Sequence, residues 1–333
     1  MPNRYAFLGL SHSPLLGLNP VAEEVRASLD SAIGAARDYV HEFDPELMLL
    51  VGPDHYNGFF NELMPPFCIG SAATSVGDYL TPAGELNVAS EHAVALTSHL
   101  MDHGFDVALS RRMKVDHGFV QALQFMWGEE LNTPPMIPIF LNAVAQPGVP
   151  RLNRCYNLGT EIGRFLATLP MRTLLIGSGG LSHEPPVPTL DHPDESVRER
   201  IIVRHEPTQE EREKKTRRVM AAGHALASGA SGMKPLNPDW DERWMDAMES
   251  GCFDDILRWS ETSIDEHGGR SAHESKTWLV ARAALGAGVP TVCKLRHYQA
   301  IPEFIAGYGI LFIEEAAETL QAPLANTHVL TRI

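Results

Sequence analysis

The chain has 333 residues, of which 44% are hydrophobic and 21% are charged, so it can form one large domain or two ordinary ones with a sizeable core. Its net charge of −15 argues against binding to nucleic acids or anionic membranes, although a local pocket can still be positive. The four cysteines include no CxxC pair, and neither a signal peptide nor an apolar run of about 20 residues is evident. We therefore expect a cytoplasmic protein with free thiols.

Two histidines follow the first two expected strands. Residues 5–10 form an apolar run that predicts a strand, and His12 comes directly after it in a Ser-His-Ser-Pro turn. Apolar residues at helical spacing over residues 20–43 predict an amphipathic helix. Residues 47–51 predict a second buried strand, which ends in a turn-rich segment that carries His55.

The next segment contains a further histidine before a helix. Residues 59–80 are irregular and are expected to form a loop that covers a substrate. Residues 88–103 predict a helix and residues 107–109 a short strand. His117 stands just before an apolar helix that is expected over residues 119–127.

A third histidine follows a strand in the middle of the chain. Residues 136–141 predict a strand, residues 152–169 a helix, and residues 173–176 another buried strand. That strand breaks into a Gly-Ser-Gly-Gly loop at residues 177–180, which allows the backbone to approach another segment closely. His183 follows this loop and precedes two prolines that stiffen the chain.

The last third of the chain is polar at first and regular afterwards. Residues 190–215 are rich in charge, and residues 191–200 are expected to lie on the surface. The expected helices cover residues 210–228, 239–250 and 271–285, and the expected strands cover residues 289–295 and 309–314. The chain beyond residue 316 shows little pattern.

Strands that alternate with helices predict an α/β fold, with a central, mostly parallel or mixed sheet flanked by helices on both faces (an α/β/α sandwich). No linker is long enough to force a boundary, so we expect a single domain over residues 1–333. Ligands bind outside the carboxyl ends of the strands in such sheets. His12, His55 and His183 each follow a strand, and we expect them to converge at one edge of the sheet.

Each candidate residue also has a purely structural explanation. His12 and His55 are either metal ligands or loop histidines bonded to the backbone. Asp54 either orients a ring nitrogen of His55 or caps the turn. His117 is either an acid or a residue at a helix entry, and His183 either faces a substrate or pins its own loop through residues 178 or 182.

A metal site of this kind needs a carboxylate, and Glu274 is a candidate. On pattern alone, Ser271 and Glu274 fit a capping box, in which the glutamate bonds back to an amide at the helix start. Glu184 and Asp54 are rival carboxylates. The glycine loop at residues 177–180 matches neither a nucleophile elbow nor a phosphate-binding loop.

Seven motifs in chain order carry a resemblance to a known family. They are SHSPL at residues 11–15, PDHYNGFF at 53–60, MPPFC at 64–68, VDHGF at 115–119, GSGGLSH at 177–183, HESKTW at 273–278 and IPEFIAGYG at 301–309. Together they resemble the class III extradiol ring-cleavage dioxygenases over about residues 5–310. The polar region at residues 190–215 and the tail past residue 315 match this family poorly.

The resemblance implies a mononuclear Fe(II) held by His12, His55 and Glu274, a donor set associated with non-haem oxygenases. It gives His183 the role of proton acceptor and His117 that of proton donor. The implied reaction of aromatic catabolism is extradiol cleavage, with O2, of a catecholic aromatic acid such as 2,3-dihydroxyphenylpropionate or 2,3-dihydroxycinnamate. The implied product is a 2-hydroxy-6-oxo-nona-2,4-dienedioate, and we expect a homo-oligomer with no nucleic-acid or membrane partner.

Two other functions stay open at this stage. Two histidines and a carboxylate also suit the zinc ion of a hydrolase. A non-catalytic binding protein would keep this fold without a metal. The cation that would meet the carboxylate of an aromatic acid is not identified by any of these patterns.

Overall fold

The structure is a computed structural model that describes residues 4–286 and 288–316. The strands, in chain order, are β1 (Tyr5–Leu10), β2 (Leu47–Gly52), β3 (Phe67–Gly70), β4 (Ala73–Val76), β5 (Ala83–Glu85), β6 (Ala108–Ser110), β7 (Met113–Val115), β8 (Met136–Leu141), β9 (Thr173–Ser178), β10 (Thr291–Ile301) and β11 (Ala306–Glu315). The α-helices are α1 (Glu23–Phe43), α2 (Ser90–Asp102), α3 (His117–Trp127), α4 (Leu152–Leu166), α5 (Glu195–Ile202), α6 (Gln209–Ala227), α7 (Pro238–Ser250), α8 (Glu261–His267) and α9 (Lys276–Ala284). Three short 3₁₀ helices are η1 (Ile256–Arg258), η2 (Arg270–Ser275) and η3 (Pro302–Phe304).

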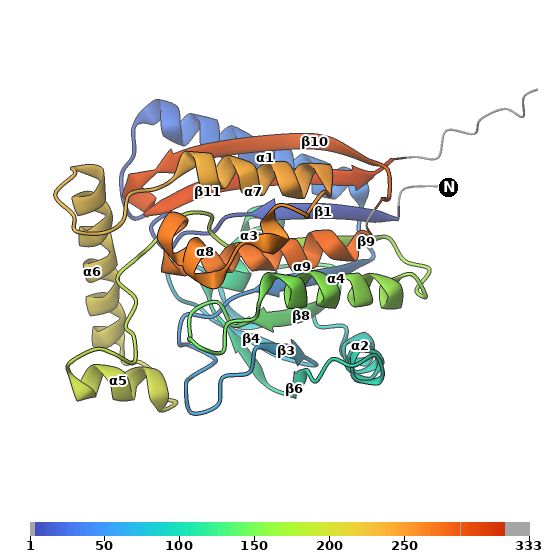
Figure 1. Cartoon of the computed structure of the whole chain (residues 1–333), viewed down its shortest axis with the longest axis horizontal. Coiled ribbons are helices and arrows are strands. Elements are labelled where there is room, and N and C mark those ends of the chain that lie inside the picture. Colours follow the sequence, from blue (N-terminus) through green and yellow to red (C-terminus); the bar gives the residue numbers. More distant parts are fainter. Residues whose placement is uncertain (1–3, 287, 317–333) are drawn as a thin grey trace, which may run out of the picture.

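Eight strands form one mixed sheet in the order β10-β11-β1-β9-β2-β8-β3-β6. The four central strands β1, β9, β2 and β8 are parallel to one another, whereas β11 and β3 run antiparallel to their neighbours β1 and β8. Helices cover both faces of this sheet (Figure 1). The predicted α/β sandwich is therefore confirmed, and the sheet is mixed.

The side chains of the central strands alternate between two cores. Phe7 and Leu49 pack in a cluster with residues of α4, α7 and α9, and Leu8 and Leu50 pack in a second cluster with residues of α1 and α3. This alternation is the period of two that an extended strand imposes. Because both faces are buried, the central strands read as continuous apolar runs.

Most predicted elements occur within a few residues of their expected bounds, and two predictions need correction. Residues 59–80 are not one irregular loop, because they contain β3 and β4. Residues 191–200 lie on or near the surface as expected, and the helix α5, which was not predicted, continues past them and buries Ile201 against Tyr56 and Phe60. The helix expected over residues 271–285 begins with the 3₁₀ turn η2 and is α-helical only in α9.

The prediction for the tail beyond residue 316 lies outside the described residues. Over residues 4–286 and 288–316, no helix has the length and apolar character needed to cross a bilayer. All four cysteines are free, as expected from their spacing.

Candidate active site

The three strand-end histidines meet at one edge of the sheet, as predicted. They follow β1, β2 and β9, and β9 lies between the other two strands and parallel to both. Glu274 stands at the point where they meet, with Oε2 3.2 Å from Nε2 of His12 and Oε1 3.1 Å from Nε2 of His55. The Nε2 atom of His183 lies 3.3 Å from the same Oε1 atom.

Glycines in the loop after β9 allow Glu274 to reach this edge. A Cβ atom at Gly179 would lie 2.3 Å from the carbonyl oxygen of Glu274, so only glycine permits this approach. The backbone N–H of Gly180 then donates to Oε2 of Glu274 at 3.2 Å. The capping-box interpretation of Glu274 is wrong, because no side chain caps η2 and the carboxylate faces the three rings instead.

The ring of His55 is oriented by Asp116 and not by Asp54. Oδ2 of Asp116 lies 3.0 Å from Nδ1 of His55 and also accepts the backbone N–H of His55. Asp54 instead accepts three backbone N–H groups, those of residues 57, 58 and 59, and so builds the turn that carries His55. The turn-capping alternative for Asp54 is therefore confirmed.

Burial and charge set the protonation of the ligand candidates. Burial alone would raise the pKa of Glu274, but the rings of His183 and His12 hold that pKa well below its usual range. Burial lowers the pKa of His12, which hydrogen-bonds through Nδ1 to Oγ of Ser178 at 3.1 Å. Burial acts in the same direction on His55, but the Asp116 carboxylate raises the pKa of that ring well above its ordinary value.

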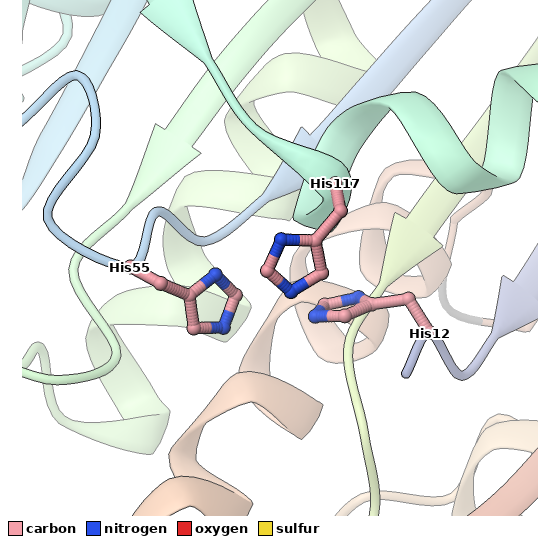
Figure 2. Close-up of side chains that lie close together, drawn as sticks. All are labelled: His12, His55 and His117. Atoms are coloured by element: carbon pink, nitrogen blue, oxygen red, sulfur yellow. The ribbon is translucent and has the colours of Figure 1, made fainter. Parts of the chain in front are cut away.

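His117 belongs to the same cluster and has its own carboxylate partner. Its backbone N–H donates to Oδ1 of Asp78 at 2.8 Å, and its Nδ1 lies 2.7 Å from Oδ2 of Asp78. Its ring stacks on that of His55 with centroids 4.5 Å apart. Figure 2 shows His12, His55 and His117 with their rings close together, and one ring nitrogen of each lies within 4.8 Å of the others.

His183 is held by its own loop while its other ring nitrogen faces the site. Nδ1 donates to the carbonyl oxygen of Leu181 at 2.8 Å, so the contact that was expected with the region of residue 182 is present. Burial would lower the pKa of His183, but the Glu274 carboxylate raises it. The rival carboxylate Glu184 pairs with Arg270 at 3.2 Å, so it is not part of the cluster.

These residues open into a cavity of ≈ 1130 Å³. Its walls include residues 77–80, so only the end of the predicted covering loop takes part. Residues of α5 and α6 line another part of it, and Figure 1 shows these two helices together at one end of the molecule. The polar region at residues 190–215, to which the sequence analysis gave no role at the site, thus covers it.

Three functional positions were missed by the sequence analysis: Asp116, Asp78 and Ser178. Asp116 had a detectable signal, because it precedes an apolar helix and caps it through the N–H of Gly118. Asp78 and Ser178 had none, since their partners lie far away in the chain. A separate cluster of His99, His103 and Glu161, to which no role was assigned, is bonded within itself and to Arg164.

Nearly the whole chain matches one known family in sequence. A model of the family described as catalytic LigB subunit of aromatic ring-opening dioxygenase matches residues 6–309. The chain belongs to this family. As a LigB-family protein it is an extradiol dioxygenase, an enzyme that opens an aromatic ring with O2.

Several curated relatives of this LigB-family chain carry one name, 2,3-dihydroxyphenylpropionate/2,3-dihydroxicinnamic acid 1,2-dioxygenase. The chain is 68% identical to the protein of that name from Comamonas testosteroni, over 93% of this chain and 97% of the relative. It is 48% identical to that from Mycobacterium sp. (strain MCS), over 90% and 95%. It is 45% identical to that from Rhodococcus sp, over 92% and 96%.

Proposed function

We propose that this chain opens the ring of 2,3-dihydroxyphenylpropionate or 2,3-dihydroxycinnamate with O2, at one Fe(II) ion. The observation that carries the proposal is the convergence of His12, His55 and Glu274 in the cavity of a LigB-family chain. The relatives described above are named for these two substrates. The expected product from the propionate is 2-hydroxy-6-oxo-nona-2,4-dienedioate, which contains both atoms of O2.

The donors that converge here fit a divalent metal ion. Two imidazoles and one carboxylate are the donor set of non-haem Fe(II) oxygenases. The Nδ1 atoms of His12 and His55 already bond to Ser178 and Asp116, so both Nε2 atoms remain directed at Glu274. Bound there, Fe(II) would supply open positions for the catechol oxygens and O2 and would acidify the bound hydroxyl.

His183 is the proposed proton acceptor. A carbonyl oxygen can only accept a hydrogen bond, so the contact with Leu181 requires that Nδ1 of His183 carries its proton. In the neutral ring, Nε2 therefore holds the free lone pair, and the ring lines the cavity. This arrangement supports removal of a proton from a catechol hydroxyl by Nε2 of His183.

His117 is the proposed proton donor. The carboxylate of Asp78 can only accept a hydrogen bond, so Nδ1 of this buried ring carries a proton and Nε2 is the nitrogen left to face a substrate. When Nε2 is also protonated, its N–H would donate a proton while the ring of the substrate opens. In this proposal His117 acts in its protonated form and His183 in its neutral form.

A zinc-dependent hydrolase is the second candidate, because one observation favours it. His12, His55 and His117 bring three ring nitrogens within 4.8 Å of one another, and catalytic zinc uses three histidines in some enzymes. Membership of a ring-opening dioxygenase family argues against this alternative and against a non-catalytic binding protein. Stoichiometric zinc, with hydrolysis and without O2 consumption, would support the hydrolase.

The proposed function is tested by loading the protein with Fe(II) without air and then adding the propionate substrate and O2. We expect O2 consumption and a yellow dienedioate product. Glu274→Gln should lose the metal and this activity, whereas Glu184→Gln, which changes a carboxylate outside the cluster, should keep both. No O2 consumption by the wild type with any catechol would refute the proposal.

Three further expectations stay predictions: the cytoplasmic location, the homo-oligomeric state and the single catalytic domain over residues 1–333. The free cysteines support a reducing compartment. Cell fractionation, light scattering and limited proteolysis would check the three in turn.

A further inference from the structure

The wall of the cavity carries a different charge from the protein as a whole. The net charge of the chain is −15, yet six lysine and arginine side chains line the cavity against four carboxylates. These four carboxylates already have partners in the described structure: Asp78, Glu211, Glu213 and Glu274. The cavity of this acidic protein therefore favours an anionic ligand.

Lys215, on α6, is the cation that is tied most directly to the site. It is half-buried, and its Nζ donates to the carbonyl oxygen of His55 at 3.3 Å. Among the residues that the structure describes, no carboxylate forms an ion pair with it. An ammonium group has three N–H donors, so two are left for a ligand beside the ring of His55.

The helix that carries Lys215 is fixed on both sides of it. A capping box between Thr208 and Glu211 begins α6. Further along the helix, Val219 is buried in the same cluster as Phe304 of η3, and a Cβ atom at Gly223 would lie 2.3 Å from a carbonyl oxygen of η3. The stem of Lys215 therefore leaves a helix whose position over the cavity is set by packing.

The same cavity offers apolar surface beside this ammonium. Val187 and Ile201 line it and pack in one small cluster, and Phe304 lines it from η3. Such surface suits the carbon chain that links an aromatic ring to a carboxylate. We propose that Lys215 binds the side-chain carboxylate of the catecholic substrate and so selects catechols that carry a short carboxylate arm, an inference that rests on the proposed function.

The test compares two substrates that differ only in this group. Wild type, Lys215→Met and Lys215→Arg are loaded with Fe(II), and kcat/KM is measured by O2 uptake with 2,3-dihydroxyphenylpropionate and with 3-propylcatechol. Lys215→Met should lower kcat/KM for the propionate roughly 10- to 100-fold, the loss expected for one charge-assisted hydrogen bond, and change that for 3-propylcatechol little. Lys215→Arg should keep most of the preference. Calorimetric titration without O2 should show the same difference in Kd.

Lys214→Met is the matched control for the positive charge of the cavity, because Lys214 is an exposed lysine that lines the same cavity from the neighbouring position of α6. Equal losses of kcat/KM for the propionate in Lys214→Met and Lys215→Met would overturn the inference, because they would indicate an effect of the total positive charge of the cavity and not of a contact with Lys215. Equal losses on both substrates in Lys215→Met would also overturn it, because they would indicate a structural role through His55. An unchanged preference in Lys215→Met would overturn this inference alone, whereas a wild type that cleaves neither catechol would overturn the proposed function as well.

Discussion

Replacing Asp116 with asparagine should weaken metal binding while leaving the fold intact. Asp116 is fully buried and accepts four hydrogen bonds, two from His55 and one each from Asn57 and Gly118. An asparagine has one acceptor oxygen, so at least one buried N–H group loses its partner, at roughly 1–3 kcal/mol. The negative charge behind the His55 ring is also lost. Removal of such a partner of a metal ligand lowers metal affinity about 10- to 100-fold.

The assay is competition for Fe(II) against a chromophoric chelator without air, with Asp78→Asn as the matched variant. Asp78 plays the same part for His117 that Asp116 plays for His55. Asp78→Asn should therefore keep the metal affinity and lower kcat. The opposite result, normal affinity in Asp116→Asn and weakened affinity in Asp78→Asn, would refute the ligand assignment and favour His117 over His55.

Three further predictions concern catalysis, packing and pH. His183→Ala should lower kcat about 10²- to 10⁴-fold while the Fe(II) content stays at the wild-type level, and normal O2 uptake by this variant would remove His183 as the base. Gly177→Ala should lower the free energy of unfolding in urea by roughly 1–3 kcal/mol, because its Cβ atom would lie 2.5 Å from Cα of Trp278. The control Gly34→Ala, whose Cβ atom would have no neighbour within 4 Å, should stabilise α1 by up to about 1 kcal/mol. Equal effects of the two substitutions would contradict the packing of Gly177 against Trp278. Burial raises the pKa of Asp241 from 3.8 to about 6, so the folded state binds this proton more tightly than the unfolded state does. The free energy of unfolding should therefore fall by about 3 kcal/mol as the pH rises from about 4 to about 6. Asp241→Asn should flatten this part of the stability profile, and an unchanged slope would show that Asp241 does not cause it.

The convergence of the three strand-end histidines could be predicted because it follows from a general property of α/β sheets. Parallel strands place their carboxyl ends at one edge, so His12, His55 and His183 had to lie on the same side. Their closeness could not be predicted in the same way. It depends on the strand order β1-β9-β2, which a single sequence does not specify.

Glu274 shows why local patterns failed at the site. The residues around it fit a capping box, but contacts with three distant rings and the amide of Gly180 hold its carboxylate instead. Asp116 and its partner His55 are likewise separated by 61 positions in the sequence. Such long-range pairs leave no periodic signal, so the patterns left Glu274 as one of three candidate carboxylates and the resemblance to a family favoured it.

The helix α6 was predicted close to its observed bounds, but its place over the cavity was not, for a different physical reason. A helix that faces a hydrophobic core shows an apolar stripe, which sequence patterns detect. Helix α6 faces a cavity for a polar ligand, and its cavity-lining residues include Lys215 and Arg218. Because charged residues occur on both sides of such a helix, its composition resembles that of a surface segment.

One crystallographic measurement tests the central claim most directly. The claim is that one iron ion is held by His12, His55 and Glu274, and that His117 and His183 stay free for proton transfer. Crystals grown with Fe(II) without air would be measured on both sides of the iron absorption edge. We predict a single anomalous peak bonded to His12, His55 and Glu274, with the rings of His117 and His183 outside bonding distance. A peak bonded to His117 in place of Glu274, or no iron peak at this edge of the sheet, would contradict the claim.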